Sequence, residues 1–147
     1  LLQQPNGGEY AGHTMQDSIF IQQAALNERT HQYLNKSRVL LLGIVNLDES
    51  NLASEAVDFQ RYRKISQNLI TEASYLRGAL NTPRQQRLHQ LVSDLEVILL
   101  QIAHLEAQEN PEAIEFVKSG VDRRGVLLKI DLEAMRRSPA PDPQPAI

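Results

Sequence analysis

The side chains best suited to catalysis or metal binding in this sequence are four histidines, and their spacing argues against a shared site. His13 stands near the start of the chain, and His31 follows Glu28 at a spacing that suits a surface pair on a helix. His89 and His104 are separated by fifteen residues, or about 22 Å along a helix axis, so they cannot bind one metal ion. We therefore expect no metal ligand and no cofactor.

Two carboxylates lie in the most apolar stretch of the chain. Asp94 and Glu96 are two residues apart, so on a helix they point about 200° away from each other and cannot act as an acid–base pair. Asp94 borders the apolar stripe and could meet a cation from a neighbouring helix, with Arg38, Arg123 and Arg124 as candidates. We interpret these five residues as structural ion pairs; a ligand-binding site is the alternative.

No other catalytic signature is present. The chain contains no phosphate-binding glycine loop, no G-x-S-x-G motif and no cysteine, which excludes thiol catalysis and disulfides. The net charge of −3 provides no basic surface for nucleic acid. We expect a protein that is not an enzyme, although an active site built from distant positions stays open.

Apolar residues repeat every seven positions, which is typical of packed helices. Three stripes carry the pattern: Leu26, Tyr33, Leu40 and Leu47; Tyr62, Leu69 and Leu76; Leu88, Leu95 and Ile102. They predict helices over 17–46, 55–80 and about 82–105. No strand-like alternation appears, so the sequence predicts an all-α fold, an antiparallel bundle of about four main helices with short connections.

The helix ends also have sequence signals. Thr82, Pro83 and Gln85 have the order of an N-cap, a first-turn proline and a capping-box partner. A short helix is expected from Pro111 to about residue 119, ending or bending near Gly120, and a last helix over 121–137. The apolar side of that last helix is expected at Val121, Leu128, Leu132 and Met135.

The expected organisation is one helical domain between two irregular ends. Residues 1–16 contain one proline, one asparagine and three glycines, and we interpret them as a loose leader. Residues 17–137 form the bundle. Residues 138–147 contain four prolines and indicate an extended tail or linker. The chain begins without methionine, which suggests a piece of a longer protein.

Apolar side chains exceed the needs of the bundle in two places. They form a second ridge on the third helix and complete an apolar ring at the end of the first. The six residues of this candidate interaction surface are Val39, Leu42, Val45, Val97, Leu100 and His104. We expect them to be buried centrally; self-association or contact with a protein partner is the alternative.

Three stretches carry a family resemblance: HQYLNKSRVLLLGIVNLD (31–48), SYLRGALNTPRQQRLHQLVSDLEVILLQIAHLE (74–106) and VKSGVDRRGVLLKIDLEAM (117–135). Together they resemble the C-terminal extracytoplasmic helical region of zinc-finger-type, membrane-anchored anti-sigma factors of acidobacteria. The likeness is a pattern of helices and loops, and no zinc ligand can be carried onto this chain.

The resemblance implies a sensory or accessory domain of a membrane-anchored transcription regulator, held outside the cytoplasm by an upstream segment. Membrane contact would then come only through that missing segment. Two alternatives stay open: a soluble cytoplasmic adaptor that grips a partner protein, and a helical sensor of a small ligand.

Overall fold

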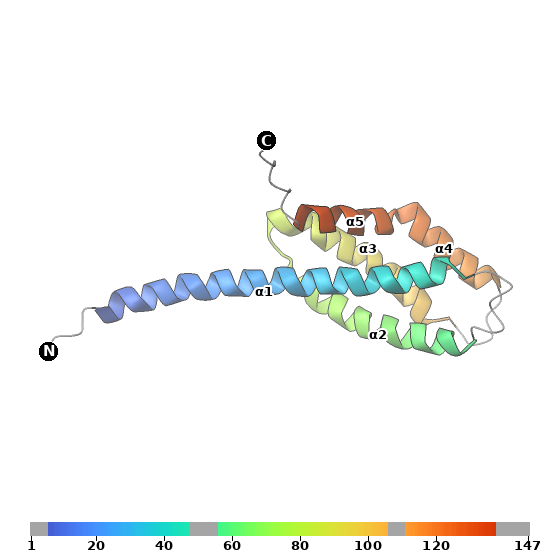
Figure 1. Ribbon diagram of the computed structural model, residues 1–147, viewed down its shortest axis with the longest axis horizontal. Coiled ribbons are helices and arrows are strands. Elements are labelled where there is room, and N and C mark those ends of the chain that lie inside the picture. The colour runs from blue at the N-terminus through green and yellow to red at the C-terminus, as the bar shows by residue number, and fades with distance from the viewer. Residues whose placement is uncertain (1–5, 48–55, 106–110, 138–147) are drawn as a thin grey trace, which may run out of the picture. The chain divides into compact units, whose positions relative to one another are not determined.

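The computed structural model describes residues 6–47, 56–105 and 111–137 (Figure 1). They form α1 (Asn6–Val45), α2 (Ala56–Ala79), a short 3₁₀ turn η1 (Pro83–Gln85), α3 (Gln86–Ala103), α4 (Pro111–Arg124) and α5 (Val126–Arg137). These three ranges contain no strand, so the predicted all-α class is confirmed. The predicted tail, 138–147, lies outside the described residues.

The chain divides into two compact units, residues 1–32 and residues 33–147. In the first unit, α1 begins at Asn6, so residues 6–16 are helical where a loose leader was expected. Glycines lower helix stability by about 1 kcal/mol each, a cost that is small enough for a long helix to extend through them. Further along this unit, Ile19, Phe20 and Ile21 are exposed.

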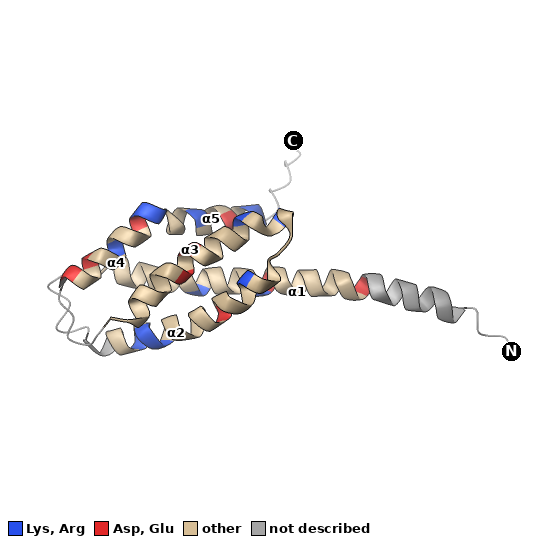
Figure 2. Ribbon diagram, turned by 180° about the vertical axis from the view of Figure 1, so that it is seen from behind, with Lys and Arg blue, Asp and Glu red and all other residues tan. Residues whose placement is uncertain are grey.

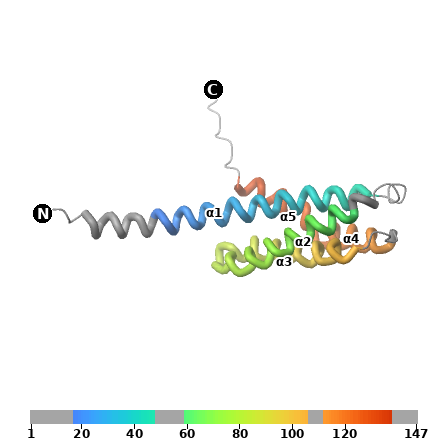
Figure 3. Tube along the Cα trace, turned by 90° about the horizontal axis from the view of Figure 1, so that it is seen from below, coloured from blue at the N-terminus to red at the C-terminus, as the bar shows by residue number. Residues whose placement is uncertain are grey.

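The second unit packs its helices around α3. Helix α3 contacts α2, α4 and α5, and the heptad stripes supply much of the buried apolar core (Figures 1 and 3). The core stripe of α3 consists of Leu91, Leu95, Ile98 and Ile102. At the end of α1, Gly43 lets the ring of Tyr62 approach, since a Cβ there would lie 3.1 Å from the Tyr62 hydroxyl. Most of the predicted stripe positions on these three helices are therefore buried, whereas Leu26, Tyr62 and Leu88 are only half-buried.

The turn that starts α3 follows its sequence signal. Thr82 is the N-cap with an extended backbone, Pro83 occupies the first turn, and the Gln85 side chain accepts the Thr82 backbone N–H at 3.3 Å. The first turn is 3₁₀ rather than α-helical, with α3 proper beginning at Gln86. The capping box predicted from the sequence is confirmed.

The break between α4 and α5 falls at Gly125 and not at Gly120. Gly125 has φ +60°, a left-handed conformation that glycine adopts without the Cβ clash of other residues. Its N–H donates to the Asp122 carbonyl at 3.1 Å, which closes the end of α4. Gly120 instead lies buried inside α4 and faces Gln101, whose side-chain oxygen would be 3.6 Å from an added Cβ.

The predicted apolar side of the last helix was largely wrong. Val121 is buried, but Leu128, Leu132 and Met135 are 64%, 40% and 69% exposed, whereas Val126, Ile130 and Glu133 are buried. The left-handed break at Gly125 rotates the next helix, so a stripe that continues from Val121 does not face the core. The buried face of α5 follows a new phase that starts at Val126.

Two basic side chains close helix ends. The guanidinium of Arg63 on α2 donates to the Leu105 carbonyl, just after α3, at 2.7 Å. The ammonium of Lys118 on α4 donates to the Leu47 carbonyl, just after α1. Carbonyls at helix ends have no intrahelical partner, so these bonds satisfy groups that would otherwise be unpaired. Arg63 therefore links α2 to the end of α3.

Candidate functional site: a groove between α3 and α5

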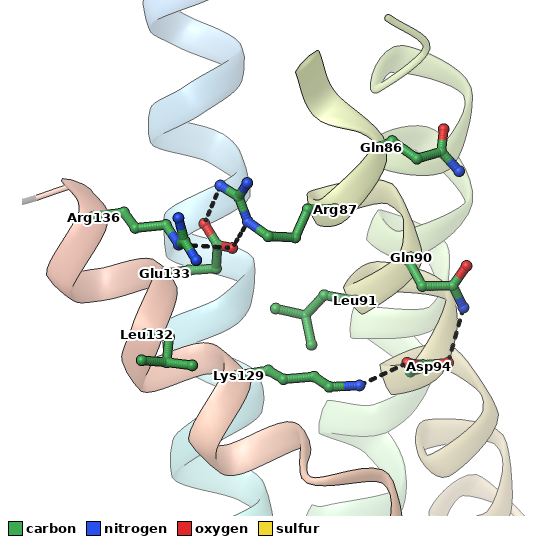
Figure 4. Close-up of a pocket in the computed structure, with 9 residues that line it drawn as sticks. All are labelled: Gln86, Arg87, Gln90, Leu91, Asp94, Lys129, Leu132, Glu133 and Arg136. Atoms are coloured by element: carbon green, nitrogen blue, oxygen red, sulfur yellow. Dashed lines mark hydrogen bonds and ion pairs between the residues drawn. The ribbon is translucent and has the colours of Figure 1, made fainter. Parts of the chain in front are cut away.

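A groove of about 370 Å³ lies between the first half of α3 and the last three turns of α5 (Figure 4). Leu91 and Leu132 provide its apolar lining, and the remaining lining residues are polar or charged: Gln86, Arg87, Gln90, Asp94, Lys129, Glu133 and Arg136. The volume falls in the range of ligand-binding clefts, about 300–1,000 Å³.

One end of the groove is organised around a buried carboxylate. The side chain of Glu133 is 6% exposed and accepts two hydrogen bonds from the Arg87 guanidinium, one of them from Nη2 at 3.3 Å (Figure 4). Arg136 Nε lies 3.8 Å from the same carboxylate. The hydrogen bond to Glu133 raises the pKa of Arg87, so that guanidinium keeps its charge. Both arginines remain about half exposed.

The other end is organised around Asp94. Lys129 Nζ lies 3.6 Å and Arg124 Nη1 3.7 Å from its carboxylate oxygens, and Gln90 donates to it at 3.2 Å. Asp94 is mostly buried, whereas the two cations are about half exposed. Each end therefore places a shielded carboxylate beneath cations that face solvent.

The groove carries a net positive charge. Three lining cations, Arg87, Lys129 and Arg136, stand against the carboxylates of Asp94 and Glu133, which gives +3 − 2 = +1, and Arg124 pairs with Asp94 from outside the lining. An arginine has five N–H donors, and the contacts with Glu133 use only two of those on Arg87. The cations can therefore bind additional acceptors while the buried carboxylates hold them in place.

The two cationic ends are about two helical turns apart. Lys129 and Arg136 are seven residues apart on α5, or about 10.5 Å along its axis. Arg87 and Asp94 are also seven residues apart on α3, and they pair with α5 in reverse order, so the helices are antiparallel. A ligand that spans the groove needs two anionic groups at this spacing with apolar surface between them.

The structural ion pairs expected from the sequence form with different partners. Asp94 pairs with Arg124, as predicted, and also with Lys129. Arg38, a predicted partner of Asp94, instead bonds Asp131 of α5 at 2.8 Å. The phase of α5 differs from the predicted one and brings Asp131 within reach of Arg38. The Arg38 side chain therefore bonds Asp131 and not Asp94.

The remaining two predicted ion-pair residues also have separate positions. Glu96 pairs with Arg77 of α2 at 2.8 Å, consistent with a carboxylate that points away from Asp94. Arg123 is exposed on α4. The phase of α4, which buries Val117 and Val121, directs Arg124 and not its neighbour towards α3.

The candidate interaction surface is not buried in the centre of the domain. Val39, Val97 and Leu100 are 68%, 38% and 41% exposed, and His104 is exposed with its ring bonded to the Leu100 carbonyl at 2.6 Å. Leu42 and Val45 are intermediate. The expectation of central burial was therefore wrong. On α3, no other described helix covers the side that carries Val97, Leu100 and His104.

Several buried hydroxyl groups stand apart from the groove. Tyr33, Ser37 and Ser66 each bury a hydroxyl that forms no hydrogen bond. Burial raises the pKa of Tyr33 well above its usual value of about 10, and the negative charge of Glu96 adds to the shift. These three hydroxyls are buried in the core and do not line the groove.

Sequence reasoning missed four of the groove residues that matter most: Arg87, Lys129, Glu133 and Arg136. They were overlooked because the last helix was assigned its apolar face from Leu128, Leu132 and Met135. A usable signal was Gly125 directly after two arginines, a typical helix C-terminus. Restarting the periodicity at Val126 places Ile130 and Glu133 on the buried side, with Glu133 in need of a cation.

Within the described ranges, no three His, Cys, Asp or Glu side chains are grouped as a metal site would require. Nor does any helix there combine the length and apolarity of a membrane-crossing segment. A comparison with known protein families, curated proteins and solved structures finds no match to this chain.

Proposed function

We propose that this chain is a non-catalytic binding domain that takes up an acidic segment of a protein partner in the α3/α5 groove. The observation that carries the proposal is the arrangement of three half-exposed lining cations, with Arg124 beside them, over two shielded carboxylates and an apolar lining. Charge-assisted hydrogen bonds from such cations provide orientation, and the leucines provide apolar contact.

The proposed setting comes from the sequence resemblance. A helical domain of a membrane-anchored, anti-sigma-like regulator would act outside the cytoplasm as its sensory or accessory part. A soluble adaptor would use the same groove on a cytoplasmic partner. In either setting, the exposed ridge of Val97 and Leu100 offers the partner additional apolar contact.

The groove can be tested with a synthetic helical peptide that carries two glutamates seven residues apart and leucines between them. Amide chemical shifts in 86–94 and 129–136 are expected to move on titration with this peptide, and to stay unchanged with a peptide in which both glutamates are glutamine. Binding that is unaffected by replacing Arg87 and Lys129 with glutamine would contradict the proposed site.

The proposed setting is tested by the complete gene and by fractionation of the native protein. An upstream membrane segment and recovery in the membrane pellet are expected for the anchored regulator. Recovery in the soluble fraction, from a gene without any such segment, would favour the cytoplasmic adaptor. A small-ligand sensor would instead show a thermal shift with a metabolite that the acidic peptide displaces.

A further inference from the structure

The chain itself presents an acidic face that matches the groove. On α4 the exposed side chains of Glu112, Glu115, Phe116, Ser119 and Asp122 lie along one side of the helix. Figure 2 shows acidic residues in the first turns of α4 and basic residues on α5. Phe116 is 58% exposed, so this acidic face also carries a large apolar side chain.

The charges of the two surfaces are opposite in sign. Three carboxylates, Glu112, Glu115 and Asp122, share the face with Arg123, which gives −3 + 1 = −2 against +1 in the groove lining. Glu115 lies 3.2 Å from Lys118, but its side chain is 68% exposed. An exposed ion pair at this spacing is weak and leaves the carboxylate accessible to other cations.

The spacing of the charges also agrees. Glu115 and Asp122 are seven residues apart on α4, as Lys129 and Arg136 are on α5. Both separations correspond to about 10.5 Å along a helix axis. One α4 helix could therefore meet both cationic ends of the groove at once, with the exposed ring of Phe116 lying between its two carboxylates along the helix axis.

The acidic face cannot reach the groove of its own chain. Arg124 of α4 points towards α3 and lies 3.7 Å from Asp94, at one end of that groove. Asp122 stands two residues earlier, about 200° away around the helix at 100° per residue, so the acidic face points away from α3. This face could therefore enter only the groove of another molecule.

We propose that the α4 face of one copy of this chain docks in the α3/α5 groove of a second copy. This inference rests on the proposed function of the groove and names its partner. The contact joins two different surfaces, so a row of copies always has a free groove at one end and a free face at the other, and association continues unless the row closes into a ring. The contact is confined to a short helix face, well below the area of a stable dimer, so the association is weak.

Sedimentation of the full chain over a range of concentrations tests the self-association. The weight-average mass is expected to rise continuously with concentration and to return to that of one chain as salt is raised from about 0.05 M to about 0.5 M, because salt screens these exposed charges. A single chain at every concentration would overturn the proposal. If the acidic test peptide still binds the groove, the proposed function survives that result.

A charge exchange tests the surfaces directly. One variant carries Glu115→Lys and Asp122→Lys on the face, and the other carries Lys129→Glu and Arg136→Glu in the groove. Each alone is expected to weaken association at least about tenfold through like-charge contact. Mixed in equal amounts they should associate again, since the basic face meets the acidic groove and the remaining wild-type surfaces meet each other.

Circular dichroism of both variants shows whether they remain folded. The face variant lies wholly on exposed positions of α4, so it stays informative if the groove variant is unstable. Leu100→Glu is the matched control on the apolar ridge of α3, and it is expected to leave the association unchanged. Association abolished by Leu100→Glu but kept by the face variant would overturn the proposal in favour of a ridge-mediated dimer.

Discussion

The buried hydroxyl of Tyr33 allows a test that separates the contribution of packing to stability from that of hydrogen bonding. Tyr33 is 1% exposed, and its hydroxyl forms no hydrogen bond. A buried polar group without a partner destabilises the fold by about 1–3 kcal/mol. Tyr33→Phe removes this group and keeps the ring, so it is expected to raise the free energy of unfolding by about 1 kcal/mol at neutral pH.

The raised pKa of Tyr33 also predicts that the free energy of unfolding changes with pH. Burial raises the pKa of Tyr33 in the folded chain, whereas the unfolded chain ionises with a pKa of about 10. Above that pH the unfolded state binds fewer protons than the folded state, so the free energy of unfolding falls as pH rises. The stability that depends on the neutral phenol is fully present below about pH 10. At pH 11 the free energy of unfolding of the wild type has fallen by about 1.4 kcal/mol relative to that of Tyr33→Phe.

Urea denaturation followed by far-UV circular dichroism at about pH 8 and about pH 11 measures both effects. The difference between variant and wild type cancels the titration of lysines and of the other tyrosines. Tyr75→Phe, whose ring is half exposed, controls for the loss of one tyrosine. The absence of cysteine excludes disulfide exchange at high pH.

Two results would refute the reasoning. A Tyr33→Phe variant less stable than wild type by more than about 1 kcal/mol at pH 8 would show that the hydroxyl has a partner in solution. An equal loss of stability in variant and wild type between the two pH values would show that the phenol ionises as readily in the fold as in the unfolded chain.

Further substitutions test the core, the helix break and the groove. Leu95→Ala removes a fully buried side chain from α3 and is expected to cost about 2–5 kcal/mol in reversible denaturation, with exposed Arg84→Ala staying within about 0.5 kcal/mol; a loss below about 1 kcal/mol would contradict the heptad register. Gly125→Ala should cost about 1–2 kcal/mol because its φ is +60°, whereas Gly78→Ala, open and helical, should stabilise by about 0.5–1 kcal/mol, and equal thermal shifts would contradict the left-handed break. Glu133→Gln should cost about 1–3 kcal/mol in urea through its bonds to Arg87, and a neutral result would mean that solvent replaces them.

The helical class and much of the core could be predicted from the sequence because helices encode their buried side locally. Seven-residue spacing placed Tyr33, Leu69, Leu95 and Ile102 in the core, and all four are buried, whereas Leu26, Tyr62 and Leu88 of the same stripes are only half-buried. The capping box at Thr82 was equally local, since its partners are three residues apart. Such features depend on neighbouring residues on one helix and need no knowledge of how helices pack.

The groove depended on contacts that no local pattern contains. Arg87 and Glu133 are 46 positions apart and meet only because α3 and α5 pack antiparallel. Asp94 finds Arg124 and Lys129 on either side of the left-handed break at Gly125.

Local sequence patterns therefore predicted where most of the helices lie and most of the apolar stripes of the first three. The tertiary structure set the phase of α5, the ion-pair partners and the exposed surfaces. The physical reason is that burial periodicity is repeated within each helix and tolerates small errors in phase. A charge pair between helices requires two side chains within about 4 Å, and one rotated helix changes every partner.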